Sequence, residues 1–106
     1  MDTVTATETW TPEGDVYTLW AEPPATRWVA SPGEGTALVA ILHELDDWER
    51  ETGRIAGVEV IGFSTFERWS AIPNLPIRWR LDGNPWLPLT ELLQRRQRQL
   101  RQSKVA

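Results

Sequence analysis

The chain contains no cysteine and only one histidine, His43, among its 106 residues. Without cysteine it can form neither a disulfide nor a thiolate metal site. A zinc site that uses two histidines on one helix is also excluded, because His43 is the only imidazole. These absences suit a reducing compartment and leave little material for nucleophilic or metal-dependent chemistry.

The sequence also lacks a long apolar run. No segment approaches the roughly 20 apolar residues that a membrane-spanning helix needs. Residues 1–5 carry neither the basic stretch nor the apolar run of a secretory signal. We therefore expect a cytoplasmic protein that does not act at a membrane.

What the chain does have is the composition of one globular domain. Apolar residues make up 41% and charged residues 25% of the total, a balance that favours a folded core over disorder. A length of 106 residues fits one domain with one core. We see no internal repeat.

Charge is divided unevenly between the two halves of the chain. Residues 1–53 hold eleven acidic and two basic residues, a net charge of −9, whereas residues 54–106 hold four acidic and nine basic residues, a net charge of +5. A chain of this kind can attract a second copy of itself or a charged partner. The overall charge of −4 argues against general coating of nucleic acid, so any such contact should be local to the C-terminal end.

Seven tryptophans are an unusually large number for a chain with two phenylalanines and one methionine. One interpretation is that indole rings fill a small core, since each ring can bury about 150–250 Å². The other interpretation is that some rings lie on an interaction surface, where tryptophan is enriched.

Alternation of apolar and polar residues predicts a β-rich body. In residues 3–10 threonine occupies every odd position, while Val4, Ala6 and Trp10 share the other face. This alternation is the pattern of a strand. Gly57, inside a later apolar stretch, indicates a bulge or a close approach of another backbone. The predicted strands are residues 3–10, 15–21, 26–30, 36–42, 54–63 and 77–81.

Three segments among these strands have further signals. Residues 36–42 are a continuous apolar run, which predicts a central strand buried on both faces. The polar residues 43–53 are expected to form a long connection or one short helix. Ser64 and Glu67 have the spacing of a capping box, which predicts the start of a short helix that runs to Ala71.

The C-terminal part of the chain is predicted to end in a basic helix. Pro88 suits the first turn of this helix, and the leucines that follow fall on one helical stripe. Beyond Leu93 the chain has nothing to bury apart from Leu100, so we expect the second half of the helix to project from the domain. The residues expected to contact a partner are Trp86, Leu92, Leu93 and Leu100.

Together these patterns predict an α+β fold: an antiparallel β-meander of five to six strands with one short helix and a C-terminal helix. Residues 1–72 are expected to form the meander domain with the short helix. Residues 73–106 are expected to add the last strand and the basic helix, as an appendage that packs on the domain or projects from it.

The stretch from Trp10 to Ser64 resembles a family of small bacterial proteins known as a domain of unknown function. Its members have a hairpin like D-P-E-A-D-V-L-Y and a final strand like G-x-I-V-G-I-E-I-L. Here residues 11–17 read T-P-E-G-D-V-Y and residues 53–61 read G-R-I-A-G-V-E-V-I, with a threonine in place of the first aspartate. The acidic stretch 43–51 is longer than the turn of the family. The resemblance implies a compact β-rich meander and brings no known activity or site residues.

The bases of the C-terminal helix form a run without acidic residues. They can contact phosphate, or dock onto an acidic protein surface such as the acidic half of a second copy. They can also form a solvated helix end, where positive charge interacts favourably with the helix dipole. Two arginines that point outward from the last predicted strand can extend this basic surface. The residues concerned are Arg78, Arg80, Arg95, Arg96, Arg98, Arg101 and Lys104.

Candidate catalytic or metal-binding residues are few. His43, Glu44, Asp46, Asp47 and Glu49 form the only cluster of suitable types, and its charges are expected to be solvated. No nucleophile with a base beside it can be proposed, so we expect no enzymatic activity, no metal and no cofactor. In an enzyme, His43 with Glu44 and Asp47 would be the first residues to test.

Two functions are therefore considered. The first is a non-enzymatic protein-interaction module, or a small subunit of a larger assembly, that docks onto a protein partner or another copy through its tryptophan-bearing surface and basic helix. The second is an accessory nucleic-acid-binding protein whose C-terminal arginines contact the phosphate backbone, with Trp69 or Trp79 stacking on unpaired bases.

Overall fold

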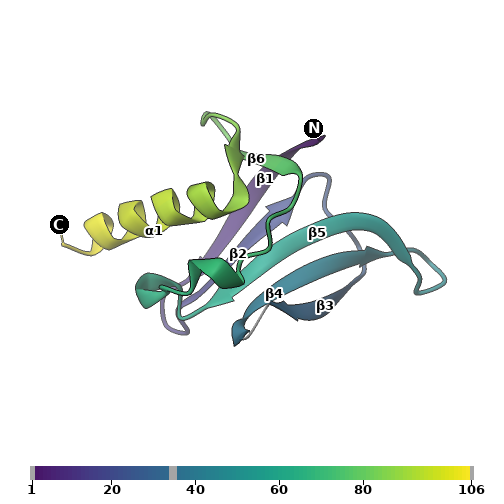
Figure 1. Ribbon diagram of the computed structural model, residues 1–106, viewed down its shortest axis with the longest axis horizontal. Helices are drawn as coiled ribbons and strands as arrows, with labels where there is room; N and C mark the ends of the chain where they lie inside the picture. The colour runs from purple at the N-terminus through teal and green to yellow at the C-terminus, as the bar shows by residue number, and fades with distance from the viewer. Residues whose placement is uncertain (1, 34–35, 106) are drawn as a thin grey trace.

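The computed structural model describes residues 2–33 and 36–105, with side chains described up to residue 102. It contains one seven-stranded sheet with the order β3-β4-β5-β2-β1-β6-β7 and one α-helix, α1, Leu89–Val105 (Figure 1). The predicted α+β class is confirmed, although the sheet has more strands than expected. The strands are β1 Asp2–Thr11, β2 Val16–Ala21, β3 Trp28–Gly33, β4 Thr36–Leu45, β5 Glu51–Ile61, β6 Ile77–Leu81 and β7 Leu87–Pro88.

The sheet is not a simple antiparallel meander. β6 lies parallel to β1, with Val4 opposite Trp79, whereas the other neighbouring strands are antiparallel. The reason is the connection of residues 62–76, which leaves the end of β5 and runs back across one face of the sheet before β6 begins (Figure 1). A parallel pair needs such a crossover, whereas a meander contains only hairpins. The expected antiparallel meander is therefore corrected.

The short helix predicted for residues 64–71 is also absent. Two single turns of 3-10 helix take its place, η1 Phe63–Thr65 and η2 Trp69–Ala71. Ser64 caps neither turn, because its amide and its hydroxyl both donate to the Asp15 carboxylate, at 3.0 and 2.7 Å. Because Ser64 is bonded to the β1–β2 turn, it is not available to cap a helix as its spacing from Glu67 predicted.

Residues 43–53 are neither a long connection nor a helix, because β4 and β5 extend through most of them as a hairpin. Asp46 closes the turn: its carboxylate accepts hydrogen bonds from the amides of Trp48 and Arg50, at 2.8 and 3.0 Å. Glu49 adopts a left-handed conformation with φ of 62°. The extended arms were not predicted because their residues are polar and lie beyond the core.

The apolar run 36–42 does form a strand, but β4 is next to the edge of the sheet and is not buried on both faces throughout. Ala37 and Leu38 are exposed, and burial begins at Val39. The expectation of a central strand buried on both faces is therefore corrected: β4 is the second strand from the edge, and the first half of the run is exposed.

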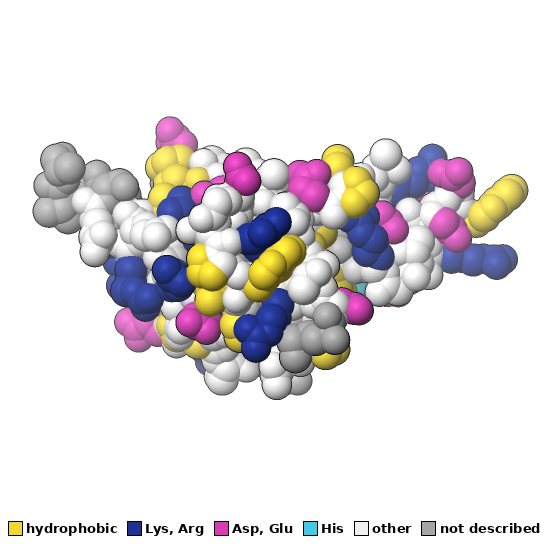
Figure 2. Space-filling view, turned by 90° about the horizontal axis from the view of Figure 1, so that it is seen from above, with side chains coloured by type: hydrophobic (Ala, Val, Ile, Leu, Met, Phe, Trp, Pro, Cys, Tyr) yellow, Lys and Arg dark blue, Asp and Glu magenta, His cyan; other side chains and the backbone are white. Residues whose placement is uncertain are grey.

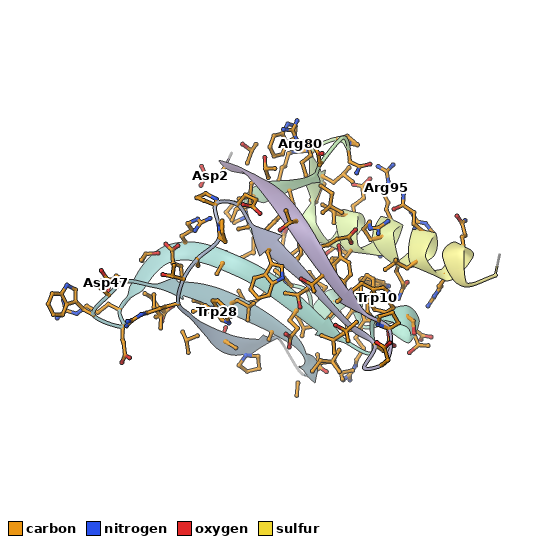
Figure 3. The ribbon with its side chains drawn as sticks, turned by 180° about the vertical axis from the view of Figure 1, so that it is seen from behind. Asp2, Trp10, Trp28, Asp47, Arg80 and Arg95 are labelled. Atoms are coloured by element: carbon orange, nitrogen blue, oxygen red, sulfur yellow. The ribbon has the colours of Figure 1, made fainter. Side chains whose placement is uncertain are left out.

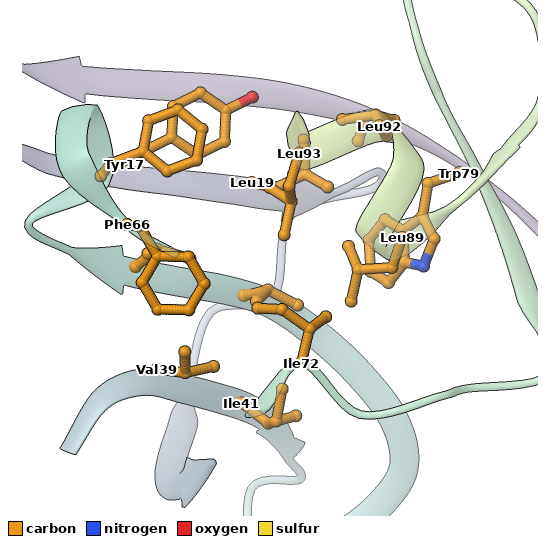
Figure 4. Close-up of a cluster of buried hydrophobic side chains, with 14 of the residues drawn as sticks. Tyr17, Leu19, Val39, Ile41, Phe66, Ile72, Trp79, Leu89, Leu92 and Leu93 are labelled. Atoms are coloured by element: carbon orange, nitrogen blue, oxygen red, sulfur yellow. The ribbon is translucent and has the colours of Figure 1, made fainter. Parts of the chain in front are cut away.

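The core lies between the sheet and the segments that cover one of its faces, which we call the inner face. Residues 62–76 and α1 both pack there, so β6, β7 and α1 share a sheet and a core with the rest of the described chain (Figures 1 and 4). The rings of Tyr17 and Phe63 stack with centroids 4.4 Å apart. No helix in the described part of the chain has the length and apolar character to cross a membrane. Prominent members of the core are Tyr17, Leu19, Val58, Val60, Phe63, Phe66, Trp79, Leu89, Leu92 and Leu93.

Some tryptophans lie in the core and others lie on the surface, so each of the two interpretations holds for part of them. Trp79 is fully buried, and Trp10 and Trp69 pack partly against the core. By contrast, Trp28 is 45% exposed and Trp48 is 81% exposed. Indole rings therefore serve both the core and the surface.

Gly57 lies where the backbones of β5 and β2 come close together. A Cβ atom at this position would lie 2.6 Å from the carbonyl oxygen of Leu19, which confirms the close approach predicted from the sequence. We expect Gly57→Ala to push the strands apart and lower the free energy of unfolding by about 1–3 kcal/mol, measured by urea denaturation. Gly14→Ala is the matched control, since its Cβ would meet no atom closer than 3.7 Å. Equal midpoints for the two variants would contradict this account.

Candidate functional site

Helix α1 packs on its own sheet, and this decides which of the predicted site residues are free. Leu92 and Leu93 are buried, and Leu100 packs partly against the core. Of the residues expected to contact a partner, only Trp86 lies outside the core cluster, and it is half-buried. The expectation that the second half of the helix projects from the domain is therefore corrected as far as Arg101, whereas the C-terminal end of α1 extends beyond the sheet (Figures 1 and 3).

Polar side chains attach this second half. The side-chain amide of Gln97 is buried and donates to the backbone carbonyls of Phe63 and Phe66, both at 2.8 Å. The Nε atom of Arg101 donates to the carbonyl of Ser64 at 2.6 Å. The helix is thus tied to the crossing segment by hydrogen bonds at positions where it has no apolar residue to bury.

Arg96 is bound to β1 rather than free for phosphate. Its Nη2 and Nε atoms contact the two carboxylate oxygens of Glu8, at 2.7 and 3.0 Å. Burial, with the neighbouring Glu8 carboxylate, raises the pKa of Tyr17 above its ordinary value. Burial alone would lower the pKa of Arg96, but the hydrogen bond to Glu8 and its charge outweigh this effect and raise it. Arg96 is therefore a fixed cation in an internal ion pair.

The other predicted arginines of this surface come from β6 and α1. Arg78 and Arg80 come from β6, and the Arg80 guanidinium lies 4.2 Å from the centre of the Trp86 ring, a cation–π contact. Arg95 and Arg98 come from α1. Figure 3 shows Arg80 and Arg95 on the same side of the molecule. Figure 2, seen from above, shows basic, acidic and hydrophobic side chains next to one another. We call Arg78, Arg80, Trp86, Arg95 and Arg98 the basic edge.

Most cations of the basic edge lack a carboxylate partner. Within the described part of the chain, Arg78, Arg95 and Arg98 form no ion pair. The predicted site residue Lys104 lies outside the side chains that the structure describes. Free positive charge at this surface therefore comes from β6 and the solvent-facing side of α1.

A small hollow lies between α1 and the β6–β7 turn, and we call it the helix groove. It is lined by Leu81, Leu87 and Leu92, of which Leu81 and Leu92 are buried, and by Arg95 and Arg96. Its volume of about 20 Å³ is enough for one water molecule and far below the roughly 300–1,000 Å³ of typical small-molecule pockets. The helix groove therefore has room for neither a cofactor nor a large side chain.

The other end of the molecule is the tip of the β4–β5 hairpin, residues 46–51, which we call the hairpin tip. Figure 3 shows Asp47 far from Arg95, in a molecule whose longest dimension is 47 Å. The hairpin tip carries four carboxylates and one arginine, Arg50. Trp48 is exposed among these charges. Such exposure of a large apolar side chain is uncommon in a folded domain.

The residues of the predicted acidic cluster have separate partners instead of forming one site. Glu44 accepts hydrogen bonds from the Thr52 hydroxyl at 2.9 Å and from Arg54 at 2.6 Å. These bonds, together with the charge of Arg54, hold the pKa of Glu44 below its ordinary value. The Asp46 carboxylate is occupied by the hydrogen bonds that close the β4–β5 turn. In the part of the chain that is described, no three His, Asp or Glu side chains are grouped to hold a metal ion.

One arrangement was missed in the sequence: Ser31, His43 and Glu51 form a line across β3, β4 and β5. The Ser31 hydroxyl lies 2.7 Å from Nε2 of His43, and Nδ1 of His43 lies 3.5 Å from the Glu51 carboxylate. Strand pairing, which sequence spacing does not reveal, brings them together.

These residue types occur in hydrolase triads, but the surroundings differ from those of an active site. The side chain of Glu51 is 61% exposed, whereas the orienting acid of a triad is buried. The principal hollows of the described surface are lined by other residues. We therefore interpret the Ser31–His43 bond as a bridge that fastens the edge strand β3 to β4.

Comparisons with protein-family models, with curated proteins and with solved structures gave no match. The motifs that resemble the small bacterial family lie at the β1–β2 turn and along β5. Membership of that family stays a prediction, and function has to be argued from the surfaces themselves.

The bridge made by Gln97 can be tested directly. We expect Gln97→Ala to lower the free energy of unfolding by about 1–3 kcal/mol, because buried carbonyls lose a hydrogen-bond partner. Gln102→Ala changes an exposed residue of the same helix and should have little effect. Urea denaturation followed by circular dichroism compares the two. Similar losses in both variants would show that the bridge does not hold the helix.

The lowered pKa of Glu44 predicts a pH dependence. Its ionised form is favoured by folding, so this stabilising contribution is present at neutral pH and is lost as pH falls through the folded-state pKa, below the ordinary value of 4.5. We expect the melting temperature of the native protein to fall more steeply between about pH 5 and pH 3 than that of Glu44→Gln. Glu13→Gln, at the exposed β1–β2 turn, is the control. Parallel curves for native protein and Glu44→Gln would refute the prediction.

Proposed function

We propose that this protein is a non-enzymatic interaction module that binds an acidic protein segment at the basic edge. The observation that carries the proposal is the set of arginines on β6 and α1 that have no carboxylate partner within the described part of the chain, with Arg80 held over the ring of Trp86. The segment belongs to a protein partner or to another copy of the chain.

Charge supports an acidic partner. Arg78, Arg95 and Arg98 leave positive charge uncompensated within the described chain, and complementary charge steers and orients association. Arg80 is held over the ring of Trp86, which restricts its motion before binding. Arginine and tryptophan are also the residues most enriched among those that dominate binding energy at protein interfaces.

The chemistry of the arginine side chain also suits such a partner. A guanidinium can pair with a carboxylate through two parallel hydrogen bonds, and it can lie over an aromatic ring, as Arg80 does over Trp86. A short segment rich in acidic residues therefore matches the basic edge.

Nucleic-acid binding is the alternative, and it has less support. Arg96 and Arg101 are bonded to the chain itself. Trp79 is fully buried and cannot stack on a base without unfolding. Phosphate contact would depend on Arg78, Arg95 and Arg98, which are the same cations that a carboxylate-bearing protein segment would use.

Fluorescence anisotropy with labelled probes can decide between these functions. We expect a short acidic peptide to bind the protein in low salt, and Arg95→Glu to weaken this binding about tenfold or more through charge reversal at the basic edge. Arg27→Glu, an exposed arginine outside the basic edge, should bind like the native protein.

Two results would contradict the proposal. One is failure of the acidic peptide to bind at millimolar concentration, and the other is equal binding by Arg95→Glu and Arg27→Glu. Tight binding of a single-stranded oligonucleotide in place of the peptide, with an affinity that falls steeply as salt is raised, would support the alternative.

A further inference from the structure

The backbone of β3 is unpaired along one side. β3 is the first strand in the order of the sheet, and no described strand lies beyond it (Figure 1). The Leu45 amide donates to the Arg27 carbonyl at 2.9 Å, so Arg27 directs its backbone groups toward β4. This direction alternates from residue to residue along an antiparallel strand. The backbone amides and carbonyls of Trp28 and Ala30 therefore face away from the sheet.

β3 lacks most of the features that protect a sheet edge from pairing with another chain. Protected edges are usually very short, charged or interrupted by proline. The strand at the opposite edge, β7, has two residues, and one of them is Pro88. β3 has six residues and no charge, and its one proline, Pro32, lies near its end. The edge from Trp28 to Ser31 is therefore open to a further strand.

Apolar side chains are exposed along the same edge. Trp28 and Val29 are each 45% exposed, and Leu38 is exposed on the neighbouring strand β4. The Trp28 ring packs edge to face against the ring of Trp20, with centroids 5.2 Å apart. A side chain that is ordered before binding loses less conformational entropy when a partner arrives. The edge thus offers both backbone groups and apolar surface to a second strand.

The edge is complementary to itself. When two β3 strands pair antiparallel with Ala30 at the centre, Trp28 of each copy lies opposite Pro32 of the other. The Ala30 amide of each copy then donates to the Ala30 carbonyl of the other, and each Trp28 amide donates to a Pro32 carbonyl. Because proline has no N–H, every β3 amide that faces this edge finds an acceptor. Trp28 and Pro32 lie on the same face of β3, so the proline ring of one copy can cover the indole of the other.

The distribution of charge also favours a second copy over a charged partner. No residue of β3 is charged, and the pairing centred on Ala30 places Arg27 of one copy opposite Gly33 of the other. The two Arg27 side chains then lie about 20 Å apart along the strands. Like charges are therefore not brought together at the contact.

We propose that two copies of this chain pair through β3 about a two-fold axis at Ala30, so that their sheets join into one continuous sheet. The same surface is used by both copies, so the contact closes at a dimer. β6 and β7 lie at the opposite edge of each sheet, and the pairing uses no residue of the basic edge. The dimer therefore presents two basic edges, and its formation does not rest on the proposed function.

Sedimentation velocity of the full chain over a concentration series tests the pairing. We expect a monomer–dimer equilibrium that changes little with salt, because β3 carries no charge to be screened. Ala30→Pro removes the amides of both central hydrogen bonds but keeps an apolar side chain, and should weaken the dimer about tenfold or more. Ala30→Lys places two like charges at the axis and should weaken it similarly. Gln102→Lys, which adds the same charge to an exposed position of α1, should dimerise like the native protein.

A single introduced thiol can locate the axis, because the chain has no cysteine of its own. Opposite residues of a hydrogen-bonded antiparallel pair have Cα atoms about 5.5 Å apart, within the range of about 4.4–6.8 Å that a disulfide spans. We therefore expect Ala30→Cys to form a covalent dimer on mild oxidation, as seen by non-reducing gel electrophoresis. Gln102→Cys, with an equally accessible thiol, should stay monomeric at the same concentration.

Three results would overturn the proposal. They are a native protein that stays monomeric at millimolar concentration, dimerisation of Ala30→Pro or Ala30→Lys like the native protein while circular dichroism shows them folded, and equal cross-linking of Ala30→Cys and Gln102→Cys. A monomer whose β3 edge binds an extended apolar peptide would also contradict self-pairing and assign the edge to another protein. These outcomes are distinct from failure of the proposed function, because a monomer can still bind the acidic peptide at its basic edge.

Discussion

Attachment of α1 to the inner face of the sheet is the interaction on which the surface of this protein depends. Leu93 enters the core, Gln97 bridges two carbonyls of the crossing segment, and Arg96 pairs with Glu8 on β1. With these contacts made, the helix lies along the sheet and turns Arg95 toward the β6–β7 turn. The helix groove exists only because the helix is held there.

The crossing of residues 62–76 is the second requirement, because it delivers β6 to the far side of β1 in a parallel orientation. There β6 presents Arg78 and Arg80 outward while Trp79 enters the core. A simple meander would place the last strand elsewhere and would separate these arginines from α1. The basic edge is therefore a product of topology.

The strands could largely be predicted from alternation, and the close approach at Gly57 from a lone glycine in an apolar stretch. The errors came from bonds between distant residues. Ser64 had the spacing of a helix cap but bonds to Asp15, and the helix after Leu93 seemed to have nothing to bury because Gln97 and Arg101 dock through hydrogen bonds. Likewise, partner-binding leucines could not be told from core leucines, since both form the same apolar stripe.

The division of charge along the sequence acquires its meaning only in the folded molecule. Glu8 of the acidic half neutralises Arg96 of the basic half inside one domain, and Glu44 is likewise paired with Arg54. Folding does not pair every charge, since Arg78, Arg95 and Arg98 form no ion pair in the described part of the chain, and neither do Asp82 and Glu91. The charges of the two halves of the sequence are therefore mixed within one domain, because strand pairing and the docking of α1 bring distant residues together.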